Sequence, residues 1–220
     1  MTEYVADVEV VVPTGGVALE GRLSVPVRAR GVVAFAHGSG SSRHSPRNLA
    51  VAEDLHAVGL GTLLFDLLTD DEAAIRHNVF DIPLLGGRLD AAVRWLTGEQ
   101  ACRGLAVGCY GASTGAGAAL WAAAEPGSPV RAVVSRGGRP DLASDQLSSV
   151  TAPTLLIVGG DDLVVLQLNR QAAAALRCEH EVAVVPGATH LFEEPGTLAQ
   201  VSLIAARWFV RHLSAADDRA

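Results

Sequence analysis

The sequence predicts a doubly wound α/β fold, with one mostly parallel sheet of about eight strands and helices on both faces. Short stretches that are apolar throughout recur along the chain, as in strands covered from both sides, and they alternate with segments of helical periodicity. No internal repeat or low-complexity linker interrupts this alternation. The length of 220 residues suits one domain. We therefore expect a single domain over 1–220, with a frayed tail at 214–220.

The first two strands are expected to form an antiparallel entry hairpin. Residues 8–12 and 17–23 are rich in Val and Leu, and residues 13–16 between them carry the sequence PTGG, which is typical of a turn. The apolar runs that follow predict the strands of the parallel part of the sheet. They lie at residues 31–36, 60–65, 105–110, 130–135, 154–158 and 182–185.

Helical periodicity appears between these strands, at about 47–58, 87–97, 114–125, 164–176 and 197–213. Pro46 suits a first helical turn and Gly59 a left-handed C-cap. The region 66–87 is less regular. It carries Asp70, Asp71, Glu72, His77 and Asp81. Because these charges lack convergent spacing, they favour a solvated helix start or loop over a metal site.

Composition excludes several classes of protein. All 17 basic side chains are arginine, so a Walker-type phosphate loop and a Schiff-base lysine, as in pyridoxal phosphate enzymes, are impossible. The acidic side chains number 24 and the net charge is −7, which disfavours nucleic acid as a partner. No organic cofactor and no metal is expected.

The expected compartment is the cytoplasm. No apolar run reaches the roughly 18 residues that a bilayer requires, so no membrane association is expected. The N-terminus lacks the basic and apolar regions of a secretory signal. Cys102, Cys109 and Cys178 are too few for a disulfide framework or a metal cluster.

The strongest chemical motif is GASTG at residues 111–115, which places Ser113 between two glycines where a buried strand meets a helix of small residues. This pattern matches a nucleophile elbow. Side chains at Gly111 or Gly115 would collide with the neighbouring strand or helix, because the serine must occupy a strained turn. The alternative is that small residues only allow close helix packing.

A serine nucleophile requires a general base that a carboxylate orients, and the chain supplies both. The strand at 154–158 ends in GGDD, which delivers Asp161 and Asp162 to the next loop. His190 follows the last strand. All of these residues are expected at the carboxyl edge of the sheet, in the order Ser, Asp, His.

With the segments GASTG, GGDDLVV and GATHLF, the sequence resembles the α/β-hydrolase superfamily, and in particular its small, capless, dienelactone-hydrolase-like branch. The resemblance covers nearly the whole chain. It implies a Gly-x-x-Asp-x-x-Val acid that maps onto Asp162, with Asp161 as the alternative. Dienelactone hydrolases use a cysteine nucleophile, whereas this elbow carries Ser113. That departure favours ordinary ester, lactone or thioester chemistry, with Cys109 packed in the core.

The resemblance also implies an oxyanion hole. A strand followed by His37 and Gly38 is similar to the family's first oxyanion loop, so the backbone N–H groups of Ser39 and Thr114 are the expected donors. His37 itself is expected to hold the loop and not to act as the base. A base at His37 would precede Ser113 in the chain, which would break the expected order Ser, Asp, His.

Four arginines fall in loops at the same sheet edge, namely Arg43, Arg47, Arg136 and Arg139. Because a guanidinium binds carboxylate or phosphate well, one hypothesis is that they bind an anionic part of the substrate. The alternative is that they brace loops.

Together these motifs predict a serine hydrolase that cleaves a carboxylic ester, lactone or related acyl bond of a small molecule through an acyl-enzyme. Ser113, Asp162 and His190 are its expected triad. The same residues would serve a thioesterase, an acyltransferase or a carbon–carbon bond hydrolase. A non-catalytic ligand receptor is also compatible with the fold. The sequence defines no oligomeric interface.

Overall fold

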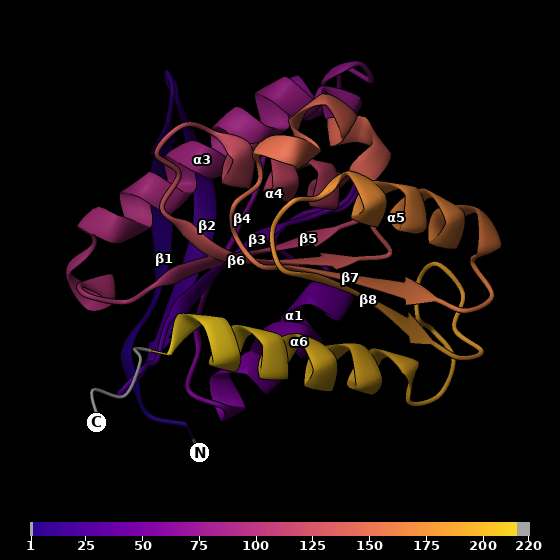
Figure 1. Ribbon diagram of the computed structural model, residues 1–220. Coiled ribbons are helices and arrows are strands. Elements are labelled where there is room, and N and C mark those ends of the chain that lie inside the picture. The colour runs from indigo at the N-terminus through magenta and orange to yellow at the C-terminus, as the bar shows by residue number, and fades with distance from the viewer. Residues whose placement is uncertain (1, 215–220) are drawn as a thin grey trace.

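The computed structural model describes residues 2–214, which are built around one eight-stranded sheet with the order β1-β2-β4-β3-β5-β6-β7-β8 (Figure 1). The strands are β1 (Tyr4–Thr14), β2 (Val17–Pro26), β3 (Val32–Ala36), β4 (Gly61–Phe65), β5 (Val107–Ala112), β6 (Val130–Arg136), β7 (Thr154–Gly159) and β8 (His180–Val185). The predicted eight-stranded α/β architecture is therefore confirmed. The tail expected after Leu213 lies outside the described residues, apart from Ser214.

The entry hairpin is antiparallel, as predicted, and the six strands from β3 to β8 run parallel to one another. Gly15 and Gly16 make the turn of the hairpin with φ angles of 60° and 103°, which side chains rarely tolerate. β2 joins the parallel part by pairing antiparallel with β4. Consequently the carboxyl ends of all six parallel strands meet at one edge of the sheet.

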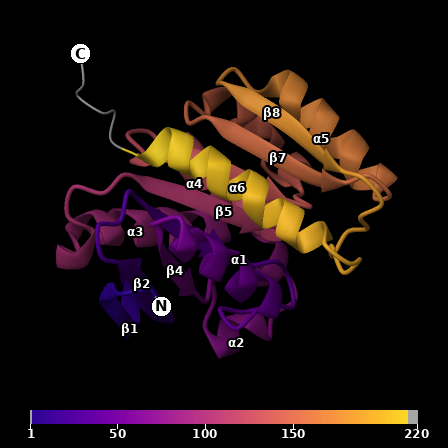
Figure 2. The same ribbon diagram turned by 90° about the horizontal axis from the view of Figure 1, so that it is seen from below.

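Helices cover both faces of the sheet, as Figures 1 and 2 show. Their bounds are α1 (Pro46–Ala57), α2 (Asp70–Ala73), α3 (Ile82–Gly98), α4 (Thr114–Ala124), α5 (Leu163–Ala175) and α6 (Thr197–Leu213). α3, α4 and α5 pack on one face and α1 and α6 on the other. Two large apolar clusters result, one on each face, beside a third, small cluster of Val158, Val165 and Leu166. Trp208 and Phe209 of α6 are buried in the second of these, so that helix uses its aromatic face against the sheet.

The region 66–87 contains more helix than the sequence predicted. Thr69 caps α2 through a capping box with Glu72, which explains the acidic run as a helix start. α3 begins at Ile82, five residues before the predicted start, because Asp81 caps its N-terminus and Pro83 fits the first turn. Short 3-10 helices, η1 (Asn78–Phe80), η2 (Gln100–Cys102) and η3 (Pro140–Ser149), complete the connections.

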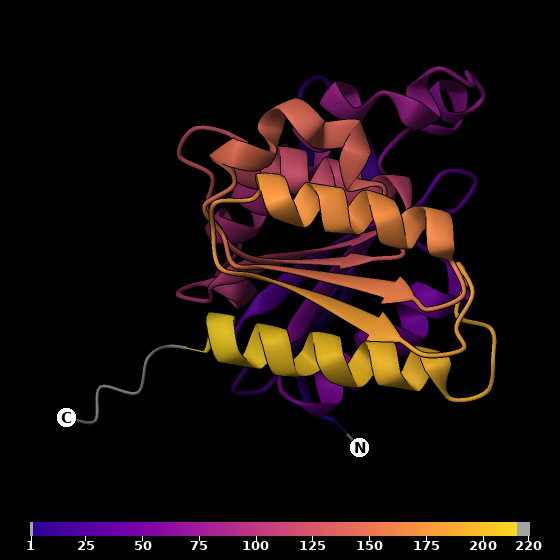
Figure 3. The same cartoon turned by 45° about the vertical axis from the view of Figure 1, so that its right-hand side comes forward.

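The segment from α2 to η1 projects beside the carboxyl edge of the sheet (Figure 3). No group of three or more potential metal ligands occurs among residues 2–214. None of the helices within residues 2–214 combines the length and the apolar composition that a transmembrane helix requires.

Candidate active site

Ser113 occupies the sharp turn between β5 and α4. Its φ of 52° and ψ of −118° are a strained conformation for a residue with a side chain. A Cβ at Gly111 would lie 2.5 Å from the Cα of Ala116, and one at Gly115 would overlap the carbonyl of Ala36. The glycines are therefore required by backbone crowding, as the motif predicted, and they let the serine stand at the end of β5.

The turn is held through its own backbone. The N–H of Ser113 donates to the carbonyl of Arg136 at 3.1 Å, and its carbonyl accepts from the N–H of Arg139 at 3.0 Å. Arg136 is the last residue of β6, and Arg139 lies in the loop that follows this strand. Ser113 is thus held by hydrogen bonds to the neighbouring strand and its loop, in addition to its own connection to β5 and α4.

His190 lies in the loop after β8 and pairs with a carboxylate in the loop between β7 and α5. Its Nδ1 lies 2.7 Å from Oδ2 of Asp162. The other carboxylate oxygen of Asp162 accepts the N–H of Val165 at 3.4 Å, so the same residue caps α5. Asp161 is exposed and contributes its backbone N–H to Ala188. The structure therefore brings Asp162, and not Asp161, to the histidine.

The loop that carries His190 has further supports. Both the N–H and the hydroxyl of Thr189 donate to the carboxylate of Glu194, at 3.1 and 2.5 Å, and these bonds lower the pKa of Glu194. A Cβ at Gly159 would lie 2.7 Å from the carbonyl of Thr189, so the loop passes directly over the end of β7. Sequence reasoning missed Glu194. The pattern Thr-x-x-x-x-Glu around the histidine was its only signal.

Ser113 and His190 line the same pocket, which has a volume of about 230 Å³. Arg47, Arg136 and Leu191 are also in its wall. Phe192, the next residue after Leu191, is buried at 2% exposure. No separate domain covers this edge of the sheet within residues 2–214 (Figure 3).

The two expected oxyanion donors are brought together, but one of them is engaged. The N–H of Ser39 donates to Oγ1 of Thr114 at 2.7 Å. The N–H of Thr114 stands at the first turn of α4, where a helix provides no acceptor. In this arrangement the Ser39 N–H is occupied by the Thr114 hydroxyl.

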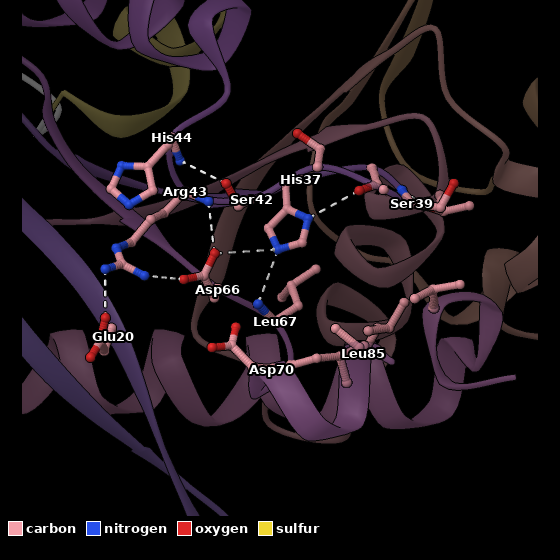
Figure 4. Close-up of a pocket in the computed structure, with 17 residues that line it drawn as sticks. Glu20, His37, Ser39, Ser42, Arg43, His44, Asp66, Leu67, Asp70 and Leu85 are labelled. Carbon is pink, nitrogen blue, oxygen red and sulfur yellow. Dashed lines mark hydrogen bonds and ion pairs between the residues drawn. The ribbon is translucent and has the colours of Figure 1, made fainter. Parts of the chain in front are cut away.

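His37 is held from both ring nitrogens, as Figure 4 shows. Its Nδ1–H donates to the carbonyl of Gly38 at 3.0 Å, and its Nε2 accepts the N–H of Leu67 at 3.1 Å. These bonds require the neutral ring. Burial lowers the pKa of His37, and the Gly38 carbonyl and Asp66 offset this effect in part. The ring therefore ties two loops together, in the role expected for it.

The four arginines divide into two groups. Arg43 forms ion pairs with Asp66 and, at 2.5 Å, with Glu20 (Figure 4). Arg139 makes a bidentate pair with Asp141 at 2.8 and 2.7 Å. Both are already neutralised by the protein, which matches the loop-bracing alternative.

Arg47 and Arg136 remain in the wall of the pocket that holds Ser113. Arg47 pairs with the exposed Glu193 at 3.2 Å. Arg136 is only 7% exposed and forms no ion pair with any carboxylate of residues 2–214. Its Nε is buried without a hydrogen-bond partner, and its guanidinium lies 5.9 Å from the centre of the Phe192 ring.

The cysteines take no part in this site. Cys109 is fully buried in β5 and Cys102 is 1% exposed. Burial raises the pKa of both thiols, to about 11 for Cys102. Neither is therefore available as a thiolate near neutral pH.

A capless doubly wound sheet, with an elbow serine and an Asp-paired histidine at its carboxyl edge, is the architecture of the α/β hydrolases. The model of the dienelactone hydrolase family matches residues 64–213. The chain belongs to this family, and its elbow carries Ser113.

Solved structures agree with this assignment. A dienelactone hydrolase from Anabaena variabilis is 53% identical, with 94% of this chain and 98% of that one covered and a TM-score of 0.92. Est1E from Butyrivibrio proteoclasticus is 15% identical, with 94% of this chain and 98% of that one covered and a TM-score of 0.79. At that identity it shows the fold alone.

A Mycobacterium tuberculosis protein that is provisionally named as a phosphoribosyl transferase is 61% identical over 207 residues. The match covers 94% of this chain and 47% of that protein. The chain thus spans less than half the length of this curated relative.

Proposed function

We propose that the protein hydrolyses a carboxylic ester, lactone or related acyl bond of a small molecule through an acyl-enzyme on Ser113. The observation that carries this proposal is the 2.7 Å contact of His190 Nδ1 with Asp162. It leaves Nε2 of the ring as the nitrogen available to the pocket that Ser113 also lines. The hydroxyl and the base therefore share one small space.

The steps follow from the residue chemistry. His190 takes the proton of Ser113 as Oγ forms a bond to the acyl carbon, and returns it to the leaving oxygen as the carbon–oxygen bond breaks. Water, deprotonated by the same ring, then releases the acid. Asp162 holds the ring in position and stabilises the imidazolium.

The developing oxyanion would be met by the backbone N–H groups of Thr114 and Ser39. Each such fixed donor is worth about 2.7–4 kcal/mol in the transition state. The Ser39 donor requires a rotation of the Thr114 side chain about χ1, which releases the Ser39 N–H. The elbow supports this arrangement because the strained backbone of Ser113 places the N–H of the next residue at the helix start.

We further propose that the substrate is an anionic small molecule. Arg136 supports this, since a buried cation without a carboxylate partner is costly unless a ligand neutralises it. Arg47 is a second candidate contact. Arg43 and Arg139 are left out of this proposal because protein carboxylates already occupy their guanidinium groups.

Reaction with a fluorophosphonate probe tests the nucleophile. The wild type should be labelled at Ser113, Ser113→Ala should not be labelled, and Ser144→Ala, an exposed serine outside the pocket, should be labelled like the wild type. An unlabelled wild type would contradict the enzyme mechanism and favour a ligand receptor. Persistent labelling of Ser113→Ala would contradict the choice of nucleophile.

A panel of oxygen esters, thioesters and lactones with the same acyl group would then separate the reactions that this triad can serve. We expect turnover of the oxygen esters and lactones to exceed turnover of the thioesters. The reverse order would indicate a thioesterase.

A further inference from the structure

Two pockets meet at the oxyanion loop, and their linings differ. The smaller one, of about 230 Å³, contains Ser113, His190 and Arg136. The larger one, of about 460 Å³, extends from Thr114 toward α2 and α3. Gly38, Ser39 and Ser41 belong to both. A carbonyl held at the oxyanion loop would therefore have one half of the substrate on each side.

Resting on the proposed function, we propose that the substrate is an ester of an anionic alcohol with an apolar acyl group. The alcohol half lies in the smaller pocket beside Arg136, and the acyl half lies in the larger pocket.

The direction of the substrate follows from the position of the general acid. His190 must return its proton to the oxygen of the leaving alcohol, so that oxygen lies on the side of the histidine. His190 lines the smaller pocket and not the larger one. The alcohol half therefore occupies the smaller pocket, and the acyl group, which stays attached to Ser113, points the other way.

The charge of the alcohol half follows from Arg136. This side chain is 7% exposed, its Nε has no partner, and no ion pair neutralises it within residues 2–214. The Phe192 ring beneath it provides a π face at 5.9 Å, which supports a cation but does not neutralise it. Arg139, three residues later, is fully paired with Asp141. Arg136 is thus left with its charge uncompensated in the wall of the reacting pocket.

The apolar character of the acyl half follows from the floor of the larger pocket. Leu67, Leu68 and Leu85 form this floor and are 1%, 7% and 3% exposed. Ala73 and Val79 extend it along the projecting segment. Covering such a surface with hydrocarbon lowers the free energy of the complex, because apolar area is removed from water.

The rim of the larger pocket disfavours an anion. Arg43, its one arginine, is paired with Asp66 and Glu20. Asp70 lies at the pocket beside Leu67 and Leu85 and makes no ion pair among the described residues (Figure 4). An acyl group that ended in a carboxylate would meet this charge, so the two pockets select opposite ends of the same molecule.

Three aryl esters test the direction of binding. Phenyl butyrate is neutral, 3-carboxyphenyl butyrate carries its charge on the alcohol half, and phenyl hemisuccinate carries it on the acyl half. We expect kcat/KM to be at least tenfold higher for 3-carboxyphenyl butyrate than for phenyl butyrate, and lowest for phenyl hemisuccinate. Equal values for the two butyrates, or a preference for the hemisuccinate, would overturn the proposal.

Arg136→Gln should reduce the ratio between the two butyrates to near one, whereas Arg136→Lys should keep most of it. Arg139→Gln, three residues later and paired with Asp141, is the matched control and should keep the wild-type ratio. The ratio is taken within each variant, so partial loss of folded protein does not affect it. An unchanged ratio in Arg136→Gln would contradict the role of this residue.

A wild-type measurement covers the case in which Arg136→Gln does not fold. The product 3-hydroxybenzoate should inhibit hydrolysis of phenyl butyrate at least tenfold more strongly than phenol does. Equal inhibition by the two phenols would overturn the anion site.

The acyl pocket is tested by Ala73→Trp, which should fill it, with Ala74→Trp on the adjacent exposed position as control. We expect Ala73→Trp to lower kcat/KM for phenyl hexanoate at least tenfold relative to phenyl acetate. A chain-length profile equal to that of the control would contradict the assignment. If Ser113 hydrolyses the esters with no preference for the position of the charge or the length of the acyl chain, only this inference is overturned. If neither hydrolysis nor probe labelling occurs, the proposed function is overturned as well.

Discussion

The loops after β3 and β8 each carry a histidine to the same edge of the sheet, yet the two rings have different surroundings. His37 is 13% exposed in its side chain and bonded at both nitrogens. His190 is 38% exposed and bonded at Nδ1 to Asp162. A ring with both nitrogens occupied can only hold structure, whereas a ring with Nε2 available can exchange a proton. The number of engaged nitrogens therefore separates the brace from the candidate base.

The largest expected effect is on activity. His190→Ala should lower kcat by about 10⁵- to 10⁶-fold, as removal of the base does in serine hydrolases, while His37→Ala should keep far more activity per folded molecule. Steady-state kinetics on a phenyl ester, with the folded fraction measured by circular dichroism, checks this. A greater loss in His37→Ala than in His190→Ala would reverse the assignment of the two histidines.

The partner of His190 gives the next effect. Asp162→Asn should lower kcat by about 10⁴-fold, because an amide at this position stabilises the wrong tautomer of His190 and does not stabilise its imidazolium form. Asp161→Asn should change kcat less than about threefold, because Asp161 contributes only its backbone N–H. Similar losses in both variants would show that the two aspartates share the role.

His37 should matter for stability. His37→Ala leaves the N–H of Leu67 without its acceptor, which costs about 1–3 kcal/mol of unfolding free energy. His77→Ala, at an 82% exposed side chain, should change the unfolding free energy by less than about 0.5 kcal/mol. Urea denaturation of the three proteins measures both values. Equal stability of His37→Ala and wild type would contradict the bracing role.

The same ring predicts a pH dependence. Burial lowers the pKa of folded His37 below the ordinary value of 6.5, so the unfolded state binds its proton first as the pH falls. The contribution of His37 to stability is therefore present above about pH 6.5 and is lost progressively below it. The unfolding free energy of the wild type should fall more steeply than that of His37→Ala between about pH 7.5 and 5. The pKa values of His56 and His212 are also lowered, but both proteins retain these residues. Parallel curves would contradict the prediction.

The smallest effect concerns the oxyanion donor on the His37 loop. Thr114→Val removes the acceptor that engages the Ser39 N–H at 2.7 Å. A net hydrogen bond is worth about 0.5–1.5 kcal/mol, so kcat should rise roughly two- to tenfold. Thr114→Ser retains the hydroxyl and should stay near the wild-type value. A fall in kcat for Thr114→Val alone would show that the hydroxyl assists the reaction.

The sequence predicted most of the strands and helices because their periodicity and caps are local. It placed the start of α3 five residues late, since the capping role of Asp81 depends on how the chain turns after η1. The crowding at Gly111 and Gly115 was predictable because the elbow motif itself implies close backbone contact. The choice between Asp161 and Asp162 followed from a family motif, and the contact with His190 agrees with it.

The sequence by itself determined the alternation of strands and helices, the elbow, and the order of Ser113, Asp162 and His190 along the chain. Only the tertiary structure separated the four arginines, because whether a guanidinium is neutralised depends on which carboxylate lies across from it. Arg43 and Arg139 found such partners, and Arg136 did not. The sequence fixes which side chains are present. Their pairing and burial depend on segments that are far apart in the sequence, and this pairing sets the charge of the pocket around Ser113.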